Sequence, residues 1–110
     1  MKENEALLYT KFLTNSQTKS SREKLLFLAV ILQALLDASK PKTNNESDSS
    51  LQARERATAW FFCSVGVTCD NFEQVCQHAG LSPSYTRSFA YKVIHSPDIK
   101  YVRQRIKKML

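Results

Sequence analysis

Apolar residues recur along this chain every three or four positions, in blocks divided by short polar stretches. That spacing is typical of helices that bury one side, whereas no block shows the strict alternation expected of a half-buried strand. The pattern predicts helices over residues 3–13, 21–39, 51–65, 72–79, 82–95 and 98–109. The predicted fold class is therefore all-α, a compact bundle of five to six helices.

The ends of these helices carry local signals. Ser82–Pro83 and Ser96–Pro97 each combine a capping serine with a proline, which the first helical turn tolerates. Gly66 is expected to end the helix that precedes it. Residues 40–50 are polar and are predicted to form a flexible linker, because they have almost no apolar surface to bury. The whole chain, residues 1–110, is predicted to be one domain, with N-terminal helices in residues 1–39 and the other helices in residues 51–110.

The segment from residue 72 to residue 95 contains a helix, a short turn and a second helix. Asp70–Asn71 is expected to cap the first helix, and Gly80 supplies the backbone freedom that a tight turn demands. This layout is that of a DNA-binding helix-turn-helix. In the second helix, an apolar stripe of Tyr85, Phe89 and Val93 is expected to face inward. The opposite face is expected to display Ser84, Arg87, Ser88, Tyr91 and His95.

The stretch VCQHAGLSPSYTRSF resembles the helix-turn-helix of DNA-binding regulators, with a small residue, a glycine, an apolar residue and a serine in the same order. One position departs from that family. Thr86 stands where most members have Val, Ile or Leu, so the buried stripe of the second helix is expected to be rotated. Residues 53–87, with their Ala-x-x-Trp-Phe and Phe-x-x-Val-Cys-x-x-x-Gly-Leu patterns, are similar to small bacterial and prophage-type proteins. The resemblance implies a bacterial or phage context and a regulatory DNA-binding role.

The distribution of charge favours the same function. The formal net charge is +6, yet residues 1–80 contain nine Lys or Arg and nine Asp or Glu. All of the net charge therefore lies in residues 81–110, where Asp98 is the one acidic residue. A field of one sign on part of a small domain attracts polyanions such as DNA. The predicted DNA-binding residues are Ser82, Ser84, Arg87, Ser88, Tyr91, Lys92, His95, Lys100, Arg103, Lys107 and Lys108.

Surplus apolar surface suggests that the chain forms a homodimer. The block from Leu25 to Leu36 is apolar around most of its circumference, with Gln33 as its polar position. A helix of that kind is either a central core element or the seam between two copies. The last predicted helix has a second apolar stripe, formed by Ile99, Val102, Ile106 and Met109. We predict a homodimer held by one of these helices, with the paired recognition helices on a common face.

Other classes of function have little support in the sequence. Cys63, Cys69 and Cys76 are spaced too widely for a zinc knuckle, so neither a metal site nor a cofactor is expected. No phosphate-binding loop and no catalytic triad spacing is present, and the chain is not expected to be an enzyme. The polar start is unlike a secretory leader and no apolar run is long enough to cross a bilayer, which together favour the cytoplasm.

Two alternatives to DNA binding remain open from the sequence. The first is a helical protein–protein adaptor or inhibitor, whose basic face binds an acidic partner. The second is a basic amphipathic C-terminal helix that lies on a membrane surface, although its apolar side is modest.

Overall fold

The computed structural model describes residues 22–110, which contain five helices and no strand. The all-α fold class is therefore confirmed for this part of the chain. The predicted helix over residues 3–13 lies outside the described residues. The helices are α2 (Arg22–Ala38), α3 (Asp48–Phe62), α4 (Val67–Ala79), α5 (Pro83–Ile94) and α6 (Ile99–Met109).

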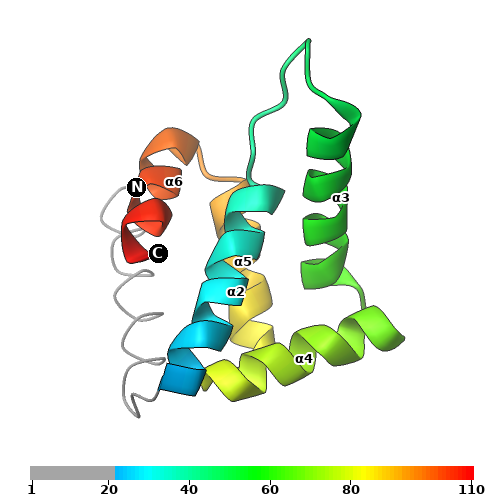
Figure 1. Ribbon diagram of the computed structural model, residues 1–110, viewed down its shortest axis with the longest axis vertical. Helices are drawn as coiled ribbons and strands as arrows, with labels where there is room; N and C mark the ends of the chain where they lie inside the picture. The colour runs from blue at the N-terminus through cyan, green and yellow to red at the C-terminus, as the bar shows by residue number, and fades with distance from the viewer. Residues whose placement is uncertain (1–21) are drawn as a thin grey trace.

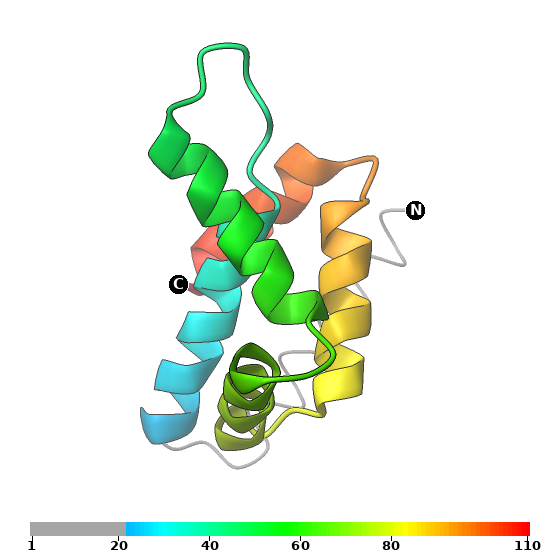
Figure 2. The same cartoon turned by 90° about the vertical axis from the view of Figure 1, so that its right-hand side faces the viewer.

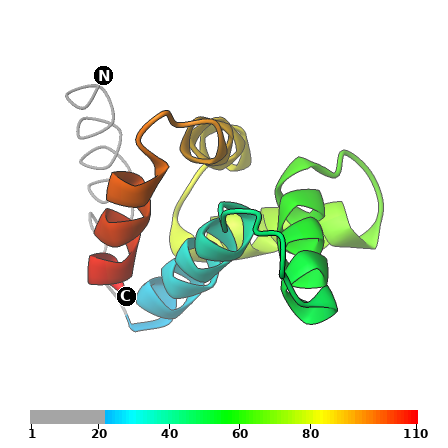
Figure 3. The ribbon, with the colours of Figure 1, turned by 90° about the horizontal axis from the view of Figure 1, so that it is seen from above.

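Helix α2 lies at the centre and contacts each of the other four described helices (Figure 1). α3 returns beside α2 after a long loop, and α4 crosses the ends of both. α5 stands on the far side of α2 from the viewer of Figure 1, and α6 flanks α2 on the side away from α3 (Figures 1 and 3). Figure 2 shows α5 rising from the end of α4, so that the two helices cross instead of lying alongside one another.

One side of α2 supplies much of the core. Leu28, Leu32 and Leu35 recur at helical spacing and are buried, together with Ile31 and Leu36 between them. The opposite side of the same helix stays apolar but uncovered: Leu26 is 68% exposed and Val30 is 47% exposed. α2 is thus a core helix on one side, and on its outer side Leu26 and Val30 remain exposed.

Aromatic side chains join α3 to α4. Phe61 and Phe72 are fully buried, and their ring centroids lie 5.8 Å apart in an edge-to-face arrangement. The Trp60 ring packs on Phe72 at 4.9 Å, while its indole N–H donates to Asn71 Oδ1 at 2.8 Å. Phe61 thus belongs to the core, and Trp60 is half-buried against it. Phe62, the third residue of the cluster, is exposed.

Two helix starts differ from the sequence expectation. α3 begins at Asp48 because Ser47 acts as its N-cap, accepting a hydrogen bond from the Ser50 N–H at 3.2 Å. α4 begins at Val67, five residues before the expected start. Gly66, expected to end α3, instead precedes α4 with a positive φ of 94°. Gly66 therefore lies at the boundary between α3 and α4 as expected, but it caps the start of α4 instead of ending α3.

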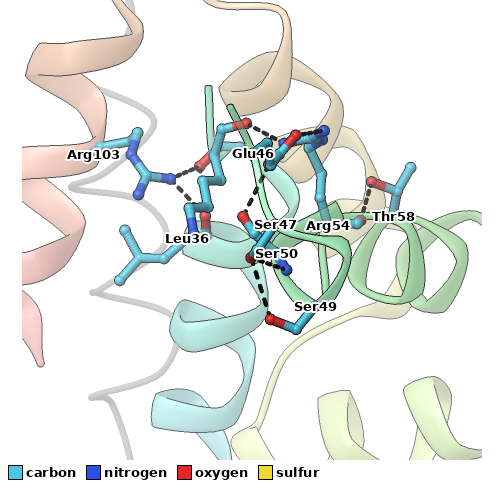
Figure 4. A network of polar contacts seen from close by, with 10 residues as sticks. Leu36, Glu46, Ser47, Ser49, Ser50, Arg54, Thr58 and Arg103 are labelled. Atoms are coloured by element: carbon cyan, nitrogen blue, oxygen red, sulfur yellow. Dashed lines mark hydrogen bonds and ion pairs between the residues drawn. The ribbon is translucent and has the colours of Figure 1, made fainter. Parts of the chain in front are cut away.

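The loop between α2 and α3 is held to α3 by an ion pair that the sequence pattern did not indicate. Arg54 is buried and donates both terminal nitrogens to the carboxylate of Glu46, with Nη2 at 2.6 Å from Oε1 (Figure 4). Nη1 also lies 3.4 Å from the Lys40 carbonyl oxygen, just after α2. The hydrogen bonds from Arg54 lower the pKa of Glu46, and the carboxylate raises the pKa of Arg54. Residues expected to be a flexible linker are therefore anchored at Glu46.

Within residues 22–110, none of the helices combines the length and the apolar character that a bilayer span requires.

Candidate nucleic-acid interface

The turn between α4 and α5 is built by a few local interactions. Gly80 ends α4 in the left-handed conformation, with φ of 77°, and its N–H donates to the Gln77 carbonyl at 3.0 Å. The next N–H, of Leu81, reaches back to the Cys76 carbonyl at 2.8 Å, which satisfies carbonyls left open at the helix end. The Leu81 side chain is buried in the angle between the helices. These residues form the tight turn that the sequence predicts.

The start of α5 also matches the expected signals. Ser82 is the N-cap, and its hydroxyl accepts a hydrogen bond from the Tyr85 N–H at 3.3 Å. Pro83 occupies the first turn, where its missing N–H costs nothing. The start of α5 is therefore fixed by the residues immediately around it.

The buried stripe of α5 is rotated, as Thr86 indicated. Thr86 is 0% exposed and its hydroxyl donates to the Ser82 carbonyl at 2.9 Å, so the polar group is satisfied inside the core. Phe89, Ala90 and Val93 complete the stripe. Tyr85, expected to belong to it, is half-buried, and burial raises the pKa of its phenol.

The opposite side of α5 is an exposed polar face. Its members recur at helical spacing, so they share one side of the helix. Tyr91 and His95 stack with ring centroids 4.2 Å apart, and the His95 ring nitrogen Nδ1 lies 2.9 Å from the Tyr91 carbonyl oxygen. We call this set the α5 face: Ser84, Ser88, Tyr91, Lys92 and His95, all exposed.

Arg87, expected on the same face as a base contact, turns toward α3. Its Nε donates to the Phe61 carbonyl at 2.8 Å and its Nη2 to the Cys63 carbonyl at 3.2 Å. The guanidinium also lies 4.7 Å from the centre of the Phe72 ring. The last carbonyls of a helix have no partner within it, and Arg87 supplies donors to those of α3. Arg87 therefore joins α5 to α3 and is not among the groups that we assign to DNA.

Arg103 has an equivalent role at the end of α2. Its Nη1 donates to the Leu36 carbonyl and lies 2.8 Å from the Ser39 hydroxyl oxygen (Figure 4). Burial lowers the pKa of Arg103, opposed by the nearby carboxylate of Asp37. A guanidinium remains charged under these conditions because its ordinary pKa is so high. Arg103 therefore stabilises the contact of α6 with α2 through its Nη1.

Replacing Arg87 by alanine is expected to lower the free energy of unfolding by about 2 kcal/mol, because charge-assisted hydrogen bonds to two partly buried carbonyls are lost. Urea denaturation followed by circular dichroism measures this loss. Lys92→Ala is the matched control: Lys92 is exposed on the same helix, and its replacement should change stability by less than about 0.5 kcal/mol. If Arg87→Ala left stability unchanged and lost binding to one DNA sequence only, Arg87 would instead be a residue that contacts DNA base edges.

The other basic residues that were predicted to bind DNA are exposed on α5 and α6. Lys100, Lys107 and Lys108 fall on one side of α6, away from the buried Val102 and Ile106. The exposed bases of the two helices are Lys92, Lys100, Arg105, Lys107 and Lys108. Asp98, the single acid after residue 80, lies between the two helices and is half-buried. The surface of α5 and α6 is therefore positive without Arg87 and Arg103.

The cysteines contribute no metal site among the described residues, where no group of three potential ligands comes together. Cys69 and Cys76 are buried thiols, Cys63 is half-buried, and none of the three is in a disulfide. Burial raises the pKa of Cys76, which keeps that thiol protonated. Packing thus accounts for the two buried cysteines.

Comparison of the chain with known proteins found no matching family model, no matching curated protein and no matching solved structure.

Proposed function

We propose that this chain binds double-stranded DNA through the α5 face and acts as a sequence-selective transcriptional regulator. The observation that supports the proposal is a polar, exposed face on a helix that follows a tight glycine turn and contacts the basic helix α6. An α-helix fits the major groove of B-form DNA, where hydroxyl, amine and imidazole groups can bond to base edges. Such a role would place the protein in the cytoplasm of a bacterial cell.

The proposal divides the exposed residues into two roles. Ser84 and Ser88 lie on the first two turns of the α5 face and Tyr91 on the third, from which side chains would reach base edges. Lys92 and His95 follow toward the end of the helix, and Ser82 lies at its N-terminus, where a phosphate is favoured. The lysines of α6 would contact phosphates, which position a protein on DNA but carry no sequence information. The phosphate contacts of α6 are Lys100, Lys107 and Lys108, and the exposed basic side chains of Lys92 and Arg105 add to them.

A homodimer is part of the proposal. One chain offers few basic side chains to DNA, so the affinity of a single chain for DNA would be modest. Joining two DNA-binding faces makes the second contact intramolecular and raises the apparent affinity without any new contact.

Replacing Lys107 and Lys108 together by glutamine is expected to weaken binding to random duplex DNA and to a selected site by about the same factor, roughly tenfold, because both side chains would contact phosphates. A mobility-shift titration with both DNAs measures the two affinities. Lys40→Gln with Lys42→Gln is the matched control, since both lysines are exposed in the loop after α2. An equal loss in the control pair, or no loss in the test pair, would contradict the assignment of α6.

A further inference from the structure

The outer side of α2 and the facing side of α3 form an apolar groove. Its α2 wall is made by residues that recur at helical spacing opposite the core side of that helix, with Leu26 and Val30 as the protruding members. Its α3 wall ends at Trp60, and Leu110 closes the side near α6. The groove is shallow and largely open to solvent, with a volume of about 750 Å³. Contiguous apolar surface of this kind on a soluble domain marks an interaction site more often than chance exposure does.

The lining of the groove combines small and large apolar side chains. Alanines leave room for the side chains of another helix: Ala29, Ala34, Ala53 and Ala57. Leu26 and Val30 line the same groove and are exposed, so a second copy can offer these larger side chains to the alanines.

The charges of the groove are complementary. Among its lining residues, Asp37 on α2 is the one acid and Arg56 on α3 is the one base. In a two-fold symmetric dimer every contact occurs twice: if one residue of the first copy contacts a different residue of the second copy, the same two residues also pair with the copies exchanged. We propose that this groove binds α2 of a second copy of the chain, with Asp37 of each copy facing Arg56 of the other.

The position of α5 gives this dimer a particular consequence, which rests on the proposed function. α5 stands on one side of α2 (Figures 1 and 3). The groove is lined by residues of the outer side of α2, opposite its buried side. In a two-fold dimer joined at the outer sides of α2, the two α5 faces lie on opposite sides of the assembly. Each copy then contacts its own duplex, or its own segment of one looped duplex. This arrangement differs from the common face expected from the sequence.

Light scattering without DNA tests the dimer by itself. At about 100 μM, a concentration at which contacts of micromolar affinity are filled, the wild type is expected at about twice the 12.6 kDa of one chain. Leu26→Glu with Val30→Glu should give the mass of one chain, with an unchanged circular dichroism spectrum because both side chains are exposed. Val65→Glu with Val67→Glu is the matched control, since these valines are exposed outside the groove, and it should remain dimeric. A wild type of monomer mass, or a dimer that survives the Leu26 and Val30 changes, overturns the inference.

A charge exchange tests the pairing of Asp37 with Arg56. Asp37→Arg and Arg56→Asp should each weaken dimerisation at least tenfold, because each places like charges opposite one another. The double variant should restore dimerisation, since positions 37 and 56 then again have opposite charges. A double variant no better than the two single variants overturns the proposed arrangement.

Capture of a labelled duplex by a bead-bound duplex tests the bridging step. Wild-type protein should link the two duplexes, and Leu26→Glu with Val30→Glu should not, although that variant should still shift a single duplex in a gel. Absence of any gel shift with dimerisation intact would reject the DNA function and leave the dimer standing. A dimer that shifts DNA but never links two duplexes overturns the opposite placement of the α5 faces.

Discussion

Raising the salt concentration from about 50 mM to about 200 mM is expected to weaken the binding of this protein to random duplex DNA roughly 250-fold. The expectation follows from the exposed basic side chains of α5 and α6. Arg87 and Arg103 are not counted among them, because both donate hydrogen bonds to backbone carbonyls. Each phosphate that a base neutralises releases close to one counterion, so four or five contacts predict a slope of about −4 in a plot of log affinity against log salt. Fluorescence anisotropy with a labelled duplex measures this slope.

A variant with fewer basic side chains separates counterion release from other effects of salt. Lys92→Gln with Lys100→Gln removes two exposed bases and should make the slope shallower by about two. Binding that does not change with salt would contradict phosphate contact by these helices. Absence of binding even at about 50 mM salt would favour the adaptor hypothesis, in which the same basic surface binds an acidic protein.

Replacing Phe72 by alanine is expected to lower the free energy of unfolding by about 3–5 kcal/mol. Phe72 is fully buried, and its ring contacts Phe61, Trp60 and the guanidinium of Arg87. The truncation would leave a cavity where α3, α4 and α5 meet. A loss of this size is a large fraction of the roughly 5–15 kcal/mol that holds a small domain folded. Urea denaturation monitored by circular dichroism at 222 nm, a wavelength that reports helix content, is the measurement.

Two control substitutions locate the effect at the buried ring. Val67→Ala changes a residue of the same helix that is 84% exposed, and it should alter stability by less than about 0.5 kcal/mol. Phe62→Ala removes an exposed aromatic ring from the same cluster and should cost much less than Phe72→Ala. A loss below about 1 kcal/mol for Phe72→Ala would mean that this ring does not hold the three helices together.

The helices that the sequence predicted best are those whose ends are fixed by neighbouring residues. α5 and α6 begin within one residue of the expected positions. Ser82 caps α5 as expected. The N-cap of α6 is Asp98 instead of Ser96, and the Ser96 hydroxyl accepts a hydrogen bond from the Asp98 N–H at 3.1 Å just before the helix. α3 and α4 were predicted less well. Ser47 starts α3 inside a stretch whose polar composition indicated a linker, and Gly66 belongs to the start of α4. Composition could not reveal which of several serines would cap a helix.

The exposed side of α5 was also predictable, apart from one residue. Helical periodicity alone places Ser84, Ser88 and Tyr91 on a common side, and the structure leaves them exposed. Periodicity could not show that Arg87 would find the carbonyls at the end of α3, because Phe61 lies 26 residues away in the chain. For Arg103 and Leu36 the separation is 67 residues. No local pattern contains information about partners at such distances.

The sequence by itself therefore determined the features that depend on neighbours within about one helical turn: the helical class, the turn at Gly80, the rotated stripe at Thr86 and the positive charge of the last thirty residues. Only the tertiary structure decided which side of α2 became core, which arginines turned inward and where an apolar groove remained open. The physical reason is that periodicity fixes which residues share a side of a helix, whereas burial and long-range hydrogen bonds depend on which other helices pack against that side.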